Sequence, residues 1–151
     1  MTELKDNIWN YRTVAITTNG SVKRDGRLVM GRGVALQAKL KFRKSGLDLK
    51  AGQMVREHGN NVHFLGVFHD KKGRQYGIYT FPVKHRWYEK ADINLIKRSA
   101  KQLYGLRYQF SRIFIPRPGC GNGGLRWEEL KPVLGEIFGD DTKFVFVTKE
   151  D

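Results

Sequence analysis

The feature that most constrains this chain is a glycine-rich stretch that joins a predicted strand to a predicted helix. It runs from Pro116 to Trp127 and has four glycines between positions 119 and 124. The apolar run 113–115 comes before it, and a helix-like segment begins at Trp127. Glycine leaves backbone N–H groups uncovered and permits positive φ, and the start of a helix attracts anions. The stretch therefore predicts a loop that holds an anion.

A second junction of the same form lies earlier, at Met30-Gly31-Arg32-Gly33-Val34-Ala35. Two such loops facing one crevice would suit a ligand with two linked phosphates. Neither loop matches the dinucleotide fingerprint, which fails at Leu36, and no Gly-Lys-Ser/Thr follows either of them. Hydride transfer and ATP hydrolysis are disfavoured accordingly.

Apolar patterning divides the rest of the chain into alternating strands and helices. Residues 8–18 hold two short strand candidates, of which 13–18 is β-branched and apolar. The remaining predicted strands are 62–68, 75–81, 112–115 and 143–148, and the predicted helices are 33–44, 47–58, 92–108 and 127–138. This alternation predicts an α/β layered fold, and the hairpin within 62–82 makes its sheet mixed.

Three predicted loops follow strand ends: Asn19, the segment 82–84 and the segment 119–124. Ligands of open α/β sheets bind at the carboxyl ends of the strands. We therefore expect these loops to line one crevice.

The chain is strongly basic, with 28 Lys and Arg against 15 Asp and Glu and a formal charge of +13. The basic residues are spread along the sequence rather than gathered in a tail. They indicate either a solvated surface or contact with a nucleic acid or a nucleotide-bearing substrate.

Cys120 is the single cysteine, which excludes a disulfide within the chain. No segment has the length and apolarity of a membrane span or signal peptide. We expect a cytoplasmic monomer that does not contact membranes. His58, His63, His69 and His85 lack the spacing of metal ligands, so neither a metal nor a cofactor is expected.

For each of three side chains, a structural and a functional interpretation stay open. Cys120 is either a nucleophile or a small packing residue. Lys84 is part of a solvated basic loop, or it acts as a reactive amine or a phosphate clamp. Trp87 either stacks on a base or covers the core.

Four stretches together resemble the macrodomain family, whose members bind ADP-ribose: 17–20, 30–35, 81–87 and 116–127. The resemblance spans nearly the whole chain in the family's order and spacing. It implies one macrodomain over 1–151, a three-layer α/β/α fold around a central mixed sheet. It is strongest for the subgroup that contains the human terminal ADP-ribose protein glycohydrolase and the antitoxin glycohydrolases that remove ADP-ribose from DNA bases.

The resemblance also implies roles for individual residues. Lys84 matches the lysine that this subgroup needs for hydrolysis at the anomeric carbon. Asn19 would face the distal ribose, and Asn7 and Ile8 would lie at the adenine. The diphosphate would lie between two loops, formed by Gly31, Gly33 and Val34 on one side and by Pro118, Gly119, Cys120, Gly121, Asn122 and Gly123 on the other.

Two positions depart from the family pattern. The family usually has Gly-Asp-Ile where this chain has Asp6-Asn7-Ile8, so an uncharged side chain stands where an aspartate holds the adenine amino group. We expect adenine recognition to be weaker or shifted. Gly123 replaces an aspartate of the human-type enzyme, as in the DNA-directed antitoxins, which leaves Lys84 as the evident catalytic group.

These features support a glycohydrolase that frees ADP-ribose from a modified macromolecule, most naturally DNA, or else protein. Two alternatives stay open, a phosphatase acting on ADP-ribose 1″-phosphate and a reader that binds ADP-ribose without turnover. The basic surface adds an expected contact with nucleic acid.

Overall fold

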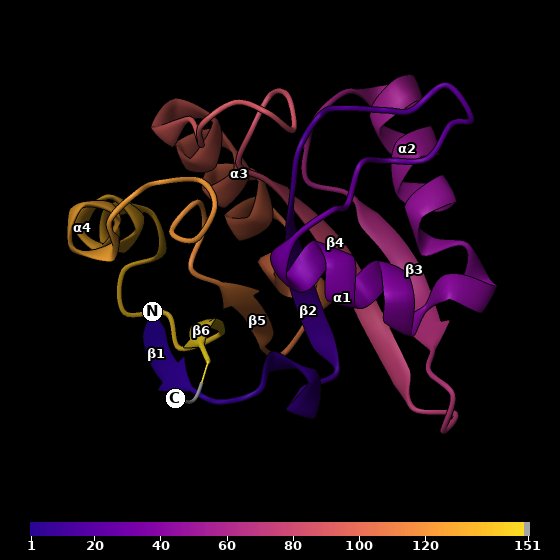
Figure 1. Ribbon diagram of the computed structural model, residues 1–151. Helices are drawn as coiled ribbons and strands as arrows, with labels where there is room; N and C mark the ends of the chain where they lie inside the picture. The colour runs from indigo at the N-terminus through magenta and orange to yellow at the C-terminus, as the bar shows by residue number, and fades with distance from the viewer. Residues whose placement is uncertain (150–151) are drawn as a thin grey trace.

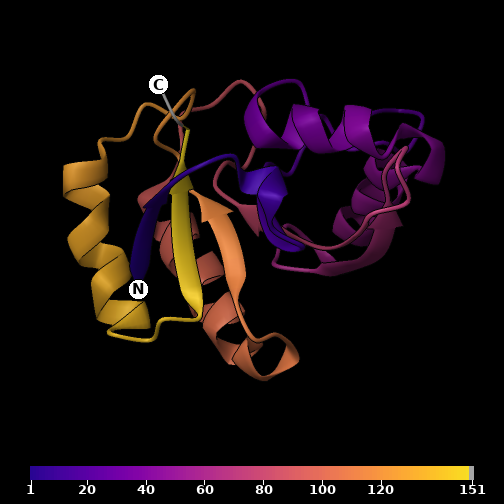
Figure 2. The same ribbon diagram turned by 90° about the horizontal axis from the view of Figure 1, so that it is seen from below.

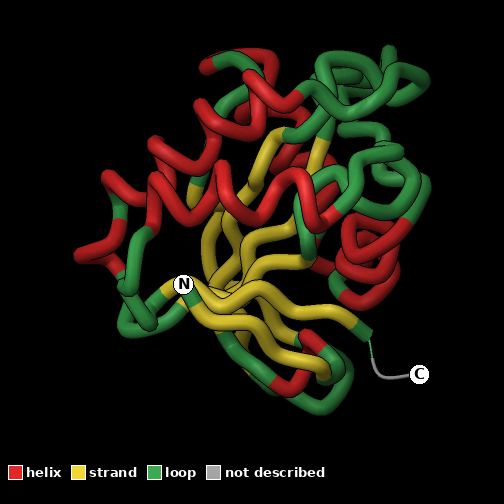
Figure 3. Tube along the Cα trace, turned by 90° about the vertical axis from the view of Figure 1, so that its left-hand side faces the viewer, coloured by secondary structure: helices red, strands yellow, loops and turns green. Residues whose placement is uncertain are grey.

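A computed structural model describes residues 1–149 (Figures 1 and 3). Six strands form one sheet in the order β1-β6-β5-β2-β4-β3. The strands are β1 (Thr2–Lys5), β2 (Thr13–Thr18), β3 (Phe64–His69), β4 (Gln75–Pro82), β5 (Ile113–Pro116) and β6 (Phe144–Thr148). The α-helices are α1 (Gly33–Lys41), α2 (Leu47–His58), α3 (Ile93–Gly105) and α4 (Trp127–Phe138).

The helices cover both faces of the sheet, and Figure 2 shows α1 and α4 on opposite sides of β5 and β6. The core of one face joins Val14 and Ile16 of β2 to Ala38 of α1 and Leu47 of α2. On the other face, Ala15 shares a core cluster with residues of α3 and α4. Both faces of β2 are therefore apolar, which confirms the three-layer α/β/α fold.

Strand pairing brings five carboxyl ends to one edge of the sheet. β2 runs parallel to β4 and β5, and β6 runs parallel to β5 and β1. Only the β3–β4 hairpin is antiparallel among the described strands, so the predicted mixed sheet is confirmed. Along the carboxyl edge the strand ends follow in the order β1, β6, β5, β2, β4, and the loops that leave β2, β4 and β5 rise together in the upper part of Figure 1.

Some predicted boundaries are wrong for local reasons. β1 was not predicted because Thr2–Lys5 is a short, mostly polar edge strand. The first strand candidate of 8–18 is instead a 3-10 turn at Ile8–Asn10. α1 and α3 end earlier than expected and pass into 3-10 turns at Arg43–Ser45 and Arg107–Gln109. The bounds of α2 and α4 match the prediction, and α4 continues through Pro132. Within residues 1–149, no helix combines the length and apolarity needed to cross a membrane.

Candidate functional site

A cleft crosses the carboxyl edge of the sheet from the end of β6 to the end of β4. It consists of two adjoining hollows of about 520 and about 850 Å³, both lined by Val34 and Pro116. Each volume lies in the range of ligand pockets. The smaller one is called here the β6 hollow and the larger one the β4 hollow.

The β6 hollow is lined by Asn7, Ile8 and the end of β6. Asn7 begins the 3-10 turn, since its Oδ1 accepts the Trp9 backbone N–H at 3.0 Å. Asp6 builds the same turn, because its carboxylate accepts from the Tyr11 hydroxyl and the Asn10 amide. Hydrogen bonds from the Tyr11 hydroxyl and the Asn7 N–H lower the pKa of Asp6. The Asn7 side-chain oxygen thus already accepts one hydrogen bond within its own turn.

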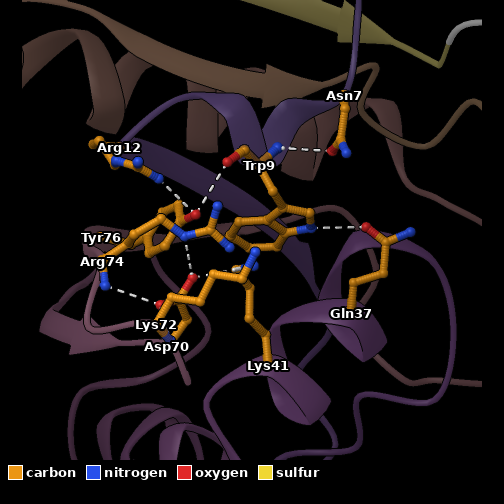
Figure 4. A network of polar contacts seen from close by, with 9 residues as sticks. All are labelled: Asn7, Trp9, Arg12, Gln37, Lys41, Asp70, Lys72, Arg74 and Tyr76. Carbon is orange, nitrogen blue, oxygen red and sulfur yellow. Dashed lines mark hydrogen bonds and ion pairs between the residues drawn. The ribbon is translucent and has the colours of Figure 1, made fainter.

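Trp9 forms part of the wall of the β6 hollow, and a polar network fixes its indole (Figure 4). Its Nε1 donates to Gln37 Oε1 at 2.9 Å, and its carbonyl accepts from the Tyr76 hydroxyl at 3.1 Å. The Lys41 ammonium lies 5.6 Å from the indole centroid. Sequence patterns do not predict this wall, because Trp9, Gln37 and Tyr76 are far apart along the chain. The one local signal was an aromatic residue two positions after a capping asparagine.

Asp70 anchors the far side of this network (Figure 4). Its Oδ2 lies 2.6 Å from Arg74 Nε and 3.7 Å from Lys41 Nζ. Burial raises the pKa of the Asp70 carboxyl, but hydrogen bonds from the Arg74 backbone N–H and guanidinium outweigh it and hold the pKa at about 2.

The first glycine loop meets the β4 hollow at the start of α1. Gly31, Arg32 and Gly33 all line it. No atom of the described chain lies within 4 Å of where a Cβ on Gly31 or Gly33 would be, and Gly33 has φ +61. Arg32 is the N-cap residue but its side chain makes no capping hydrogen bond. The space beside these two glycines is thus open in the described chain, and the binding of an anion there stays a prediction.

The second glycine loop is folded tightly on itself. A Cβ on Gly123 would lie 2.5 Å from the Gly119 carbonyl oxygen, and one on Gly119 would lie 2.7 Å from Ala91 Cβ. The Leu125 N–H donates to the Gly119 carbonyl at 2.9 Å. A Cβ on Gly121, in contrast, would meet nothing within 4 Å in the described chain. Gly119 and Gly123 thus serve packing as well as the cleft wall, whereas Gly121 is open.

Pro118 and Cys120 do not line either hollow. Pro118 is buried, and Cys120 packs against the core between the sheet and α3 and α4. The Cys120 thiol donates to the Pro118 carbonyl at 3.5 Å, and burial raises the pKa of that thiol. This geometry matches the packing interpretation of Cys120.

The loop after β4 forms the third wall and carries Lys84. The Val83 N–H donates to Thr18, the Asp92 N–H donates to Val83, and Asn60 Nδ2 donates to the Lys84 carbonyl at 3.0 Å. Lys84 itself is half-buried, with its Nζ 3.5 Å from the Trp87 carbonyl oxygen. These contacts hold the amine at the β4 end of the cleft.

Asn19 and Glu89 also line the β4 hollow. The Asn19 side chain shapes its own loop, donating to the Val29 carbonyl and accepting from the Ser21 N–H. Glu89 is a carboxylate that no sequence motif predicts to lie in the cleft. Within residues 1–149, no three His, Cys, Asp or Glu side chains gather as a metal site would require.

The structure thus brings together residues from all three predicted loops. Lining one or the other hollow are Asn7, Ile8, Asn19, Gly31, Gly33, Val34, Lys84, Gly119, Gly121, Asn122 and Gly123.

No protein-family model matches the sequence. A curated relative, a DNA ADP-ribosyl glycohydrolase of Thermus aquaticus, is 33% identical over 72% of this chain. The aligned part makes up 30% of that relative, so the chain spans under a third of its length.

Solved structures with the same fold include two DarG macrodomains. That of Thermus aquaticus superposes with a TM-score of 0.70 at 26% identity, over 99% of this chain and 97% of the other. That of Mycobacterium tuberculosis gives a TM-score of 0.70 at 23% identity, over 99% and 97%. Thermosipho africanus DarTG in complex with ADP-ribose gives 0.70 at 20% identity, over 92% of this chain and 38% of that one.

Proposed function

The chain belongs to the macrodomain family, and we propose that it binds ADP-ribose in the cleft and hydrolyses the bond joining ADP-ribose to a base of modified DNA. The relative at 33% identity carries that activity in its name. The +13 charge of the chain suits a substrate with a phosphate backbone.

The order of parts along the cleft supports ADP-ribose as the ligand. In this arrangement the adenine lies in the β6 hollow beside Asn7 and Ile8. The diphosphate passes between the open glycines of the two loops, Gly31 and Gly121, next to the uncapped start of α1. The distal ribose then lies in the β4 hollow beside Asn19 and Lys84.

The observation that carries the hydrolase assignment is the place of Lys84. It lines the β4 hollow together with both glycine loops, whereas Asn7 lines the β6 hollow, and the anomeric carbon of the distal ribose would lie beside it. An amine held there can act in two ways. It can attack the anomeric carbon or the opened sugar, forming a carbon–nitrogen bond that water later breaks, or it can stabilise the departing base. In both routes one water is consumed, the glycosidic bond breaks and the base leaves with a proton.

A substrate panel tests the proposal. The protein is incubated with a DNA oligonucleotide ADP-ribosylated on a base, with an ADP-ribosylated protein and with ADP-ribose 1″-phosphate, and products are identified by mass spectrometry. We expect free ADP-ribose from the oligonucleotide. Phosphate released from the 1″-phosphate alone would instead support a phosphatase. Calorimetric binding of ADP-ribose without turnover of any substrate would support a reader.

A further inference from the structure

The segment 84–90 carries two large aromatic side chains that the core does not use. Trp87 is 57% exposed and Tyr88 is 68% exposed, although both line the β4 hollow. Their rings lie 5.6 Å apart at an interplanar angle of 89°. Trp87 therefore does not cover the core, and the two rings form an aromatic pair at the mouth of the cleft.

The backbone of this segment is tied at several points, so the exposure of the rings is built into the loop. The Trp87 N–H donates to Ser21 Oγ at 3.0 Å, and the Gly20 N–H donates to the His85 carbonyl at 3.1 Å. His85 Nε2 lies 2.7 Å from Asp92 Oδ2 at the start of α3. The rings are thus presented on a fixed support a few residues from Lys84.

Charges around the pair favour an anionic partner. The segment holds Lys84, Arg86 and Lys90 against the single carboxylate of Glu89, and all but Lys84 are exposed. Aromatic faces beside cations suit nucleobases and phosphates together, because every base has a π-face and every nucleotide a negative charge.

We propose that Trp87 and Tyr88 form a stacking surface for the unpaired bases of a single nucleic acid strand, next to the base that is joined to ADP-ribose. The inference rests on the proposed function. A base must leave the duplex stack before its linkage can enter a cleft. Stacking on Trp87 and Tyr88 replaces the base-stacking contacts that the strand loses when it leaves the duplex. Arg86 and Lys90 bind the phosphates of the strand.

Two measurements test the surface. The first is binding of a fluorescently labelled, unmodified single strand of DNA, followed by anisotropy. The second is hydrolysis of an ADP-ribosylated oligonucleotide compared with ADP-ribose joined to one nucleoside. We expect the paired substitution Trp87→Ala with Tyr88→Ala to weaken strand binding and raise the KM for the oligonucleotide by roughly tenfold or more. Because both rings also line the β4 hollow, the KM for the nucleoside substrate and the affinity for free ADP-ribose should change by a several-fold smaller factor than the KM for the oligonucleotide. Trp87→Phe should restore most of the strand binding.

Tyr108→Ala is the matched control. Tyr108 is 80% exposed and lies near two cations, Arg107 and Lys143, but it follows α3 and does not line the cleft. Equal loss of strand binding in this variant would overturn the proposal, as would an unchanged KM in the Trp87/Tyr88 variant. An equal loss of affinity for free ADP-ribose, or an equal rise in the KM for the nucleoside substrate, would also overturn it. If the wild-type protein hydrolyses nothing, the proposed function fails, yet the binding of the unmodified strand still decides for or against the stacking surface.

Discussion

The Arg32 guanidinium donates a hydrogen bond to Asn122 Oδ1 at 3.3 Å, across the cleft between the two glycine loops. Both side chains are exposed, and both residues line the β4 hollow. The contact links the start of α1 to the loop after β5 at the level where the diphosphate would lie. A cation at this point can bind a phosphate directly or keep the two loops closed around it.

Arg32→Ala should therefore weaken ADP-ribose binding by roughly tenfold, the usual order for one charge-assisted hydrogen bond. The loss should shrink at high salt because the site is exposed. Calorimetry at low and high ionic strength measures both effects. Arg24→Ala, an exposed arginine in the loop before α1, is the control. Equal affinity of Arg32→Ala and wild type would exclude a role for the bridge.

Substitution of the open Gly121 and of the packed Gly123 should have opposite effects on ligand binding and on stability. Gly121→Val should leave the melting temperature nearly unchanged but block ADP-ribose, because its side chain would project into open space at the cleft. Gly123→Ala should destabilise the fold by about 1–3 kcal/mol, because its Cβ would meet the Gly119 carbonyl oxygen at 2.5 Å.

Thermal unfolding and calorimetry separate these cases. Gly135→Ala in α4 is the control, since its Cβ also meets no described atom within 4 Å and the residue is outside the cleft. Unfolding of Gly121→Val, or normal binding by it, would contradict the assignment of Gly121 to the cleft.

The low pKa of Asp70 predicts that the stability of the fold decreases at acid pH. Its pKa is about 2 in the folded chain, against 3.8 as the ordinary value. A depressed carboxyl pKa stabilises the fold above the ordinary value, and the contribution is lost as pH falls toward the folded pKa. The free energies of unfolding of wild type and Asp70→Asn should differ at pH 6 and converge between about pH 4 and pH 2. Urea titrations across this pH range measure these free energies of unfolding, with the exposed Asp140→Asn as control. If wild type and Asp70→Asn differed by the same amount at every pH, the role of Asp70 would be refuted.

Cys120 should be dispensable for catalysis. Its thiol faces the core, and burial raises its pKa, so little thiolate forms near neutral pH. Cys120→Ala should keep hydrolysis within about threefold of wild type, and the native protein should react slowly with iodoacetamide. Rapid alkylation together with loss of activity would restore the nucleophile interpretation.

Much of the fold could be predicted because its signals are local. The apolar runs of the central strands and the turn residues after them fixed most elements, and loops that follow parallel strands must meet at one edge. β1 escaped prediction because an edge strand needs little apolar patterning. The packing role of Gly119 and Gly123 also escaped it, since their neighbour Ala91 comes from another loop.

The site was predictable where its residues lie at strand ends, as with Asn19 and Lys84. It was not predictable where several elements converge on one side chain. Gln37 of α1 and Tyr76 of β4 hold Trp9 through contacts 28 and 67 residues apart in sequence. Similarly, the exposure of Trp87 excludes the interpretation that it covers the core, and that exposure depends on the fold of the whole loop.

The most direct test of the account is turnover of an ADP-ribosylated single-stranded oligonucleotide by Lys84→Ala. The release of ADP-ribose should fall roughly 10²- to 10⁴-fold, as for loss of a group that acts on the reacting bond. Calorimetry should find the affinity for free ADP-ribose within about threefold of wild type. Lys97→Ala, an exposed lysine on α3, should behave as wild type. Undiminished release by Lys84→Ala would contradict the central claim that this amine, fixed at the β4 end of the cleft, drives hydrolysis.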